Sequence, residues 1–198
     1  MKPADVSRWS AWLVCGGLGV QTGLLWLLYP GDRDAYTHAF ALTRGLGWSG
    51  LVALCAGLCA TPLGTLLRSR GHAADAWTRE LRRLLGIAAA GAALAHAALA
   101  FCALPDTRNA VMEAPQLRTG LAGLLILLLL LITSFPRVVR ALHVRSWKEL
   151  HRLAYVAFAL AFLHVLHAPY VPIRSALWLA ALTLSVGLLR FVARQRGP

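Results

Sequence analysis

Six long stretches without a charged residue dominate this sequence. They begin directly after Arg8, Arg44, Arg83, Arg118, Arg152 and Arg174, and they hold 23, 23, 22, 18, 21 and 15 residues in that order. The second, for example, lies between Arg44 and Arg68. A transmembrane helix needs roughly 17–25 mainly apolar residues. Five stretches meet this length, and the sixth reaches it when the Arg190 side chain extends to the membrane surface.

Composition agrees with a membrane protein and excludes an ordinary soluble one. Hydrophobic residues make up 58% of the 198 residues and charged residues 14%, whereas soluble domains carry about 25% charged residues. A soluble domain of this size cannot bury so much apolar surface. We therefore predict an all-α integral membrane protein with six transmembrane helices, forming a single domain over residues 1–198.

The six helices alternate with short connections that leave no room for a soluble domain. No internal repeat is evident along the chain. The predicted helices are approximately Trp9–Tyr29, Gly45–Leu67, Leu84–Leu104, Thr119–Phe135, Leu150–Pro169 and Ile173–Val192.

The net charge of +12 is distributed very unevenly between the two predicted membrane faces. The side that holds both termini carries 15 of the 20 Lys and Arg residues, and the other side carries 5. Basic residues accumulate on the cytoplasmic side of bacterial membrane proteins. We therefore predict that both termini are cytoplasmic in a multi-pass protein of the bacterial inner (plasma) membrane. The basic excess is explained by membrane lipid and topology, and nucleic-acid binding is not expected.

A glycine motif at the start of the second predicted helix imitates a dinucleotide-binding fingerprint. Gly45-Leu46-Gly47-Trp48-Ser49-Gly50 matches G-x-G-x-x-G. A dinucleotide-binding function requires a preceding strand and a βαβ unit, whereas here the motif lies at the start of a predicted membrane helix. We expect it to serve as a surface for close helix packing.

Two histidines lie well inside apolar helices at matched depths. His96 is 12 residues beyond Leu84, and His164 is 14 residues beyond Leu150, which correspond to about 18 and 21 Å along helices that run in the same direction. An ionisable residue inside a membrane indicates function, and two facing imidazoles suit the axial positions of a haem. A haem between the third and fifth helices is therefore expected. Hydrogen bonding of each histidine to a neighbouring helix is the alternative.

His151 lies near the predicted cytoplasmic surface and is a candidate ligand for a second haem. It precedes His164 by 13 residues, so the two side chains do not share one face of a straight helix, and a second haem requires a bend. It also requires a partner ligand. The matching level of the third helix carries Arg82 and Arg83, so a loop histidine or another ligand type would have to serve.

Three further residues have open roles. Arg82 and Arg83 are candidates for binding haem propionates or a flavin phosphate, and anchoring at the membrane interface is their alternative role. His167 is an alternative ligand to His164.

Several residues resemble the ferric-reductase-like transmembrane family, over roughly Leu46 to His167. The most specific piece is W-x-x-L-H-x-x-x-Y, followed by a histidine 13 residues after the first. The matching residues are Gly47-Trp48, Thr61-Pro62-Leu63, Arg82-Arg83-Leu84-Leu85-Gly86, His96, Thr133-Ser134, Trp147, Leu150-His151, Tyr155 and His164.

The resemblance implies a b-type haem protein, with one haem or two, in which His96, His151 and His164 are the ligand candidates. It implies flavin mononucleotide as a further cofactor. It also implies electron flow from a cytoplasmic flavin reductase or the quinone pool to a periplasmic molybdopterin subunit that reduces methionine sulfoxide. Such a chain is an electron-transfer subunit of an oxidoreductase system and not a complete enzyme.

Two positions depart from the family pattern on the predicted outer face. The family carries a histidine near the position of Arg44, and an arginine where Ala114 precedes Pro115. Both changes bear on the identity of a periplasmic partner more than on haem binding. A stand-alone ferric, metal or quinone reductase and a cofactor-free membrane scaffold subunit therefore stay open as alternatives.

Overall fold

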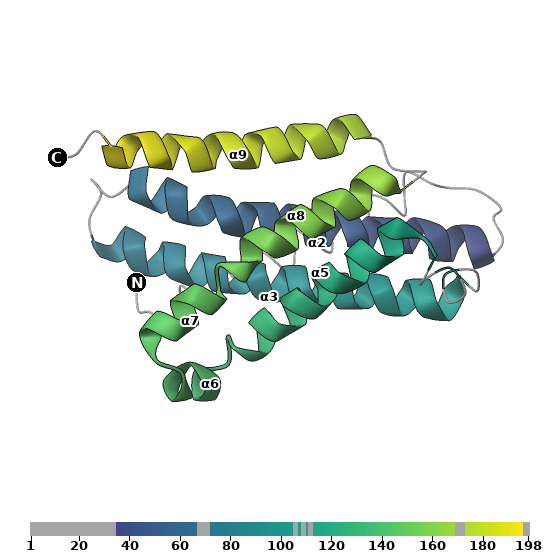
Figure 1. Ribbon diagram of the computed structural model, residues 1–198, viewed down its shortest axis with the longest axis horizontal. Helices are drawn as coiled ribbons and strands as arrows, with labels where there is room; N and C mark the ends of the chain where they lie inside the picture. Colours follow the sequence, from purple (N-terminus) through teal and green to yellow (C-terminus); the bar gives the residue numbers. More distant parts are fainter. Residues whose placement is uncertain are drawn as a thin grey trace.

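Every regular element that the structure describes is a helix (Figure 1). The computed structural model describes residues 35–66, 72–104, 107, 110, 113–168 and 173–195. Its helices are α2 (Ala35–Leu66), α3 (His72–Ala103), α5 (Pro115–Ile132), α6 (Pro136–Ala141), α7 (Val144–Leu150), α8 (Leu153–His167) and α9 (Ile173–Gln195). The first predicted helix, Trp9–Tyr29, lies outside the described residues.

Two helices extend well beyond the predicted membrane stretches. α2 begins at Ala35 where Gly45 was predicted, and α3 begins at His72 where Leu84 was predicted. A charged residue ends an apolar stretch without ending a helix, because Arg and Glu are good helix formers. Within the described residues, the stretches long and apolar enough to cross a membrane are Thr37–Ala60, Trp77–Ala103, Pro115–Ile132 and Arg145–His167.

The predicted fifth helix, Leu150–Pro169, is interrupted near its start. α7 ends at Leu150, His151 and Arg152 form a turn, and α8 begins at Leu153. The backbone N–H of His151 still bonds to the carbonyl of Trp147 at 3.0 Å, but that of Arg152 bonds to Glu149 at 3.1 Å. This shift from a four-residue to a three-residue hydrogen bond tightens the chain locally. The interruption falls at His151, where a second haem would require a bend.

The long helices run in alternating directions along one bundle (Figure 1). α2 packs most extensively against α3, and α5 packs most extensively against α8, while α9 packs against α2. The short helices α6 and α7 lie at the end of the bundle where α3 begins, and α8 runs from there toward the other end. The bundle is therefore built from two antiparallel pairs, α2–α3 and α5–α8.

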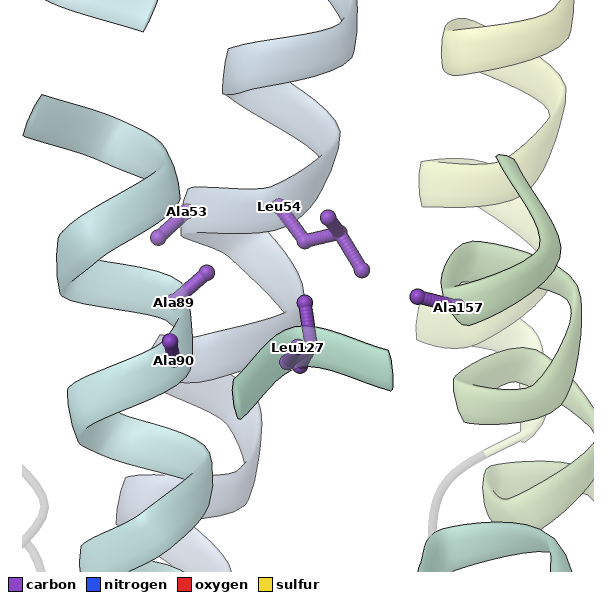
Figure 2. Close-up of a cluster of buried hydrophobic side chains, with 6 residues drawn as sticks. All are labelled: Ala53, Leu54, Ala89, Ala90, Leu127 and Ala157. Carbon is purple, nitrogen blue, oxygen red and sulfur yellow. The ribbon is translucent and has the colours of Figure 1, made fainter. Parts of the chain in front are cut away.

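Four alanines and two leucines from α2, α3, α5 and α8 form one buried cluster (Figure 2). The buried cluster consists of Ala53, Leu54, Ala89, Ala90, Leu127 and Ala157. Ala89 and Ala157 are 0% exposed. In a membrane, helices associate through close packing, and small residues let their backbones approach. The alanines thus bring α3 and α8, which carry the two intramembrane histidines, close to their neighbours.

Overpacking at Ala89 should destabilise the bundle. The Ala89 side chain is 0% exposed, so Ala89→Leu must displace α2 or the cluster, at a cost of about 1–3 kcal/mol. Ala98→Leu is the matched control, because Ala98 is exposed on the same helix. Thermal unfolding in detergent should show a lower midpoint for Ala89→Leu only. Equal midpoints for the two variants would contradict the assignment of this core.

Candidate functional site

The imidazole rings of His96 on α3 and His164 on α8 face each other across the bundle. Their centroids lie 5.9 Å apart, and the ring planes meet at 82°. The two residues are separated by 68 positions along the chain, so the fold brings them together. The prediction that they lie at one depth is confirmed.

Each ring is held by a backbone carbonyl of the neighbouring helix. Nδ1 of His96 lies 2.7 Å from the carbonyl oxygen of Thr43 on α2. Nδ1 of His164 lies 2.7 Å from the carbonyl oxygen of Gln116 on α5. A carbonyl only accepts a hydrogen bond, so each Nδ1 carries the proton. The lone pair of each neutral ring is therefore on Nε2, and this nitrogen is available to a metal.

A largely apolar pocket surrounds the two rings. Its wall comes from α2, α3, α5 and α8 and from Thr107. The apolar lining includes Leu51, Leu54, Phe101, Leu124, Leu127 and Val165.

The geometry fits a haem held between the two histidines. Metal–imidazole bonds are roughly 2 Å long, so two imidazoles on opposite sides of one metal have centroids on the order of 6 Å apart. Direct edge-to-face packing of rings covers the same range. Two features favour a ligand pair: each Nδ1 is bonded to a backbone carbonyl, which leaves the lone pair on Nε2, and both rings line a pocket.

Two protein nitrogens form an incomplete set for a bare ion but a complete axial set for a haem. A tetrahedral zinc site takes four ligands. In the described part of the chain, no three His, Cys, Asp or Glu residues gather into a metal-binding group. A haem supplies its own equatorial nitrogens, so the pair His96 and His164 is sufficient for it.

Arg44 is the one charged residue among the described residues that line this pocket. It lies on α2 one helical turn before Gly47, which packs against His96. A guanidinium is the preferred partner of a carboxylate. The sequence alone did not predict that Arg44 lines the site, because nothing in the spacing of basic residues connects it to His96. Arg44 stood out there only as a departure from the family pattern.

The two halves of the site share one local arrangement, which the sequence reading did not detect. In each pair, the residue whose carbonyl accepts the hydrogen bond from the histidine is followed by two glycines on the same helix, and two alanines precede the histidine on the other helix. The positions are Thr43, Gly47 and Gly50 with Ala89, Ala93 and His96, and Gln116, Gly120 and Gly123 with Ala157, Ala161 and His164. The spacing within each helix is identical.

The motif Gly45–Gly50 has the packing role expected from the sequence. Gly47 packs against the His96 ring, and Gly50 packs against the backbone of Ala89 and Ala93. Ser49 is 1% exposed, and its hydroxyl donates to the carbonyl of Gly45 at 3.0 Å. A glycine motif at this position therefore lets α2 approach the helix that carries His96.

His151 lies in a separate cluster at the α7–α8 turn. Its ring packs against that of Trp147 with centroids 4.1 Å apart and planes tilted by 34°, and its Nδ1 lies 3.1 Å from the Trp147 carbonyl. Its Nε2 lies 3.4 Å from the hydroxyl of Ser134, and the Trp147 indole N–H donates to the carbonyl of Thr133 at 3.0 Å. Arg82 is close enough to interact electrostatically with His151.

The other predicted site residues lie away from the pocket. Arg83 pairs with Glu80 on its own helix at 2.6 Å and is not a pocket residue. His167 is exposed, and its Nδ1 lies 2.7 Å from the carbonyl of Leu163 in the same helix. Neither His167 nor His151 lines the pocket. The structure thus brings together only His96 and His164 of the predicted ligand candidates.

Comparison with known proteins gives matches over most of the chain. The family model described as ferric reductase like transmembrane component matches residues 46–162. A protein from Deinococcus radiodurans is 35% identical over 162 residues, covering 78% of this chain and 77% of that protein. One from Rhodospirillum rubrum is 32% identical over 167 residues, covering 79% and 76%. Both are named protein-methionine-sulfoxide reductase heme-binding subunit MsrQ.

Proposed function

Because this chain belongs to the ferric-reductase-like transmembrane family, we propose that it is the haem-binding membrane subunit of a methionine sulfoxide reductase system. In this role it transfers electrons across the bacterial membrane to a partner reductase. The observation that carries the proposal is the pair of facing imidazoles, each with Nδ1 bonded to a backbone carbonyl, in an apolar pocket. The names of its relatives support the cofactor and the partner system.

His96 and His164 would hold a haem b through their Nε2 atoms, and Arg44 would bind a haem propionate. When bound, the haem supplies one-electron chemistry. The chain's own residues fix the ligand orientation, exclude water and provide one positive charge. Thr43 and Gln116 orient the rings through their carbonyls, and apolar side chains such as Leu124 and Phe101 keep the surroundings dry. Burial and hydrogen bonding of the ligands tune the reduction potential.

We assign the direction of transfer from the distribution of charge. With both termini in the cytoplasm, the basic end formed by α6, α7 and the start of α3 faces inward. Electrons would enter there from a cytoplasmic flavin reductase or the quinone pool. They would leave from the His96–His164 end toward a periplasmic molybdopterin subunit. Flavin mononucleotide is not part of the proposal, because the names of the relatives give haem as the bound group.

Two other functions compete with this one. A stand-alone metal or quinone reductase would use the same haem, so partner-dependent methionine sulfoxide reduction separates it from the proposal. A cofactor-free scaffold subunit would keep His96 and His164 as ring neighbours without a metal. A haem spectrum from the purified protein would exclude this scaffold function.

Removal of either pocket histidine should remove the low-spin haem. The oxidised and dithionite-reduced spectra of the purified wild-type protein should show a haem with two axial imidazoles. His96→Ala and His164→Ala should each lose the haem or leave it with one protein ligand, because each ring supplies one axial nitrogen. His167→Ala, which changes an exposed histidine, is the matched control. Retention of the wild-type spectrum in both pocket variants would contradict the proposal.

Arg44 should contribute to haem affinity through its charge. Hydrogen bonds to charged groups contribute about 1.5–3 kcal/mol, so Arg44→Gln should weaken haem binding by about 10–100-fold. It should also lower the reduction potential, because the ferrous state loses a nearby positive charge. Arg44→Lys should retain part of the affinity, and Arg118→Gln, an exposed residue outside the pocket, should change nothing. Equal haem titrations for Arg44→Gln and Arg118→Gln would rule out this role.

His151 should serve electron entry and not the pocket haem. His151→Ala removes the ring packed against Trp147 but leaves the contacts of His96 and His164 intact. We expect the low-spin spectrum of the pocket haem to persist, with slower reduction by a soluble flavin reductase in proteoliposomes. Loss of the pocket haem spectrum would contradict this separation, and a fall in the haem-to-protein ratio would identify His151 as a ligand of a second haem.

A further inference from the structure

Each pocket histidine packs its ring edge onto a glycine of the neighbouring helix. A Cβ added to Gly47 would lie 3.0 Å from Nδ1 and 3.1 Å from Cε1 of His96. A Cβ added to Gly120 would lie 2.7 Å from Nδ1 and 3.0 Å from Cε1 of His164. The distance from the Gly120 Cβ to Nδ1 is below the closest contacts that a real side chain tolerates, and the distance from the Gly47 Cβ to Nδ1 is at that limit. Alanine at either position therefore requires the imidazole to move.

Backbone conformation does not explain these glycines. Both lie inside helices, and neither has a positive φ. Glycine inside a helix is roughly 0.5–1 kcal/mol less favourable than alanine. The space that the rings occupy is the feature that excludes alanine from these two positions.

Other described glycines of the bundle do not contact a histidine ring. A Cβ on Gly50 or Gly123 would approach its nearest atom at 3.4 or 3.5 Å, an ordinary contact distance. A Cβ on Gly86 or Gly91 would meet nothing within 4 Å, and one on Gly64 would lie 2.6 Å from the Thr78 side chain. The tight approach to a histidine ring is therefore specific to Gly47 and Gly120 among these seven glycines.

The glycine and the carbonyl act on the same edge of each ring. Gly47 follows Thr43 by one helical turn on α2, and Gly120 follows Gln116 by one turn on α5. The carbonyl accepts from Nδ1–H at 2.7 Å in both cases, while the missing side chain lets Nδ1 and Cε1 lie against the helix. Removing this space would rotate or shift the ring away from the carbonyl.

We propose that Gly47 and Gly120 are positioning residues that fix the rotation of the two ligand imidazoles, and so set their near-perpendicular orientation and the reduction potential of the haem. The inference rests on the proposed haem function. Rotation about the Cβ–Cγ bond of histidine is soft, so the ring itself does not hold the 82° angle. The glycine surface and the carbonyl hydrogen bond hold it instead.

The expected effect of alanine follows from ligand basicity. A hydrogen bond from Nδ1–H to a carbonyl makes the imidazole a stronger donor to the metal. Stronger donation favours ferric over ferrous iron, so loss of the bond raises the reduction potential. A tenfold loss in the preference for ferric haem corresponds to about 59 mV for one electron. The shift should be larger for Gly120→Ala than for Gly47→Ala, because the Cβ would approach Nδ1 more closely, 2.7 against 3.0 Å.

The test compares Gly47→Ala and Gly120→Ala with Gly86→Ala and Gly91→Ala in the haem-loaded, detergent-purified protein. Gly86 and Gly91 are exposed glycines of α3, and an added Cβ would meet nothing within 4 Å of either. Two readouts are electron paramagnetic resonance of the ferric haem, which reports the angle between axial imidazole planes, and the midpoint potential. The two ring-contacting variants should lose the signal of near-perpendicular imidazoles. Their midpoint potential should rise, because the preference for ferric over ferrous haem should fall by up to about tenfold. The two controls should match the wild type.

If the purified wild-type protein contains no haem, the proposed function is wrong. The results for the glycine variants test the positioning role alone. Wild-type signals and potentials in both ring-contacting variants would overturn the positioning role. If Gly120→Ala does not fold, Gly47→Ala decides the question, because its contact is the milder. If neither ring-contacting variant folds in the absence of haem while Gly86→Ala and Gly91→Ala both fold, the positioning role is also overturned, because Gly47 and Gly120 would then serve helix packing.

Discussion

The hydrogen bond from each histidine Nδ1 to a carbonyl on the neighbouring helix is the interaction on which the site depends. It joins α3 to α2 through His96 and Thr43, and α8 to α5 through His164 and Gln116. A helical carbonyl is normally bonded within its own helix, so each bond adds a second donor to a group already aligned by the helix. It fixes the tautomer and leaves the lone pair on Nε2, the atom that would bind the haem in the proposed function. The geometry of the helix pairs thereby becomes the geometry of the metal site.

Small residues make these hydrogen bonds possible. Ala89 and Ala157 are fully buried where the two helices of each pair meet. Gly47 and Gly120 leave room for the rings. Larger side chains at these positions would separate each histidine helix from its carbonyl. The same close packing leaves a pocket of apolar side chains beyond the rings. In such surroundings a single charge such as Arg44 has a large effect on a bound anion, because water screens it weakly.

The sequence was sufficient to predict the helices and the two central histidines. Charge-free stretches predicted all five described long helices, α2, α3, α5, α8 and α9, although α9 is not among the four stretches long and apolar enough to cross a membrane. The helical rise predicted that His96 and His164 lie at one level. The predicted helix starts were wrong by many residues at α2 and α3, because charge marks the membrane boundary and not the helix boundary. The turn at His151 could not be predicted either, since no Pro or Gly breaks the chain there.

The partners of the histidines required the structure. Thr43 and Gln116 act through backbone carbonyls, so their side-chain identities carry no signal. Arg44 reaches the pocket by its position on α2, and it is unremarkable among 20 basic residues. Identical spacing of glycines and alanines in the two helix pairs was visible in the sequence. Only the contacts show that these residues surround equivalent histidines, because most of the other residues at equivalent positions differ between the two helix pairs.

The central claim is that His96 and His164 together hold one haem within this bundle. Electron paramagnetic resonance of the oxidised, haem-loaded wild-type protein tests it most directly, because the spectrum reports both spin state and the angle between the axial ligands. The 82° angle between the rings predicts a low-spin ferric haem with near-perpendicular imidazole planes. A high-spin haem with one protein ligand, a low-spin signal of parallel imidazoles, or a protein that takes up no haem would contradict it.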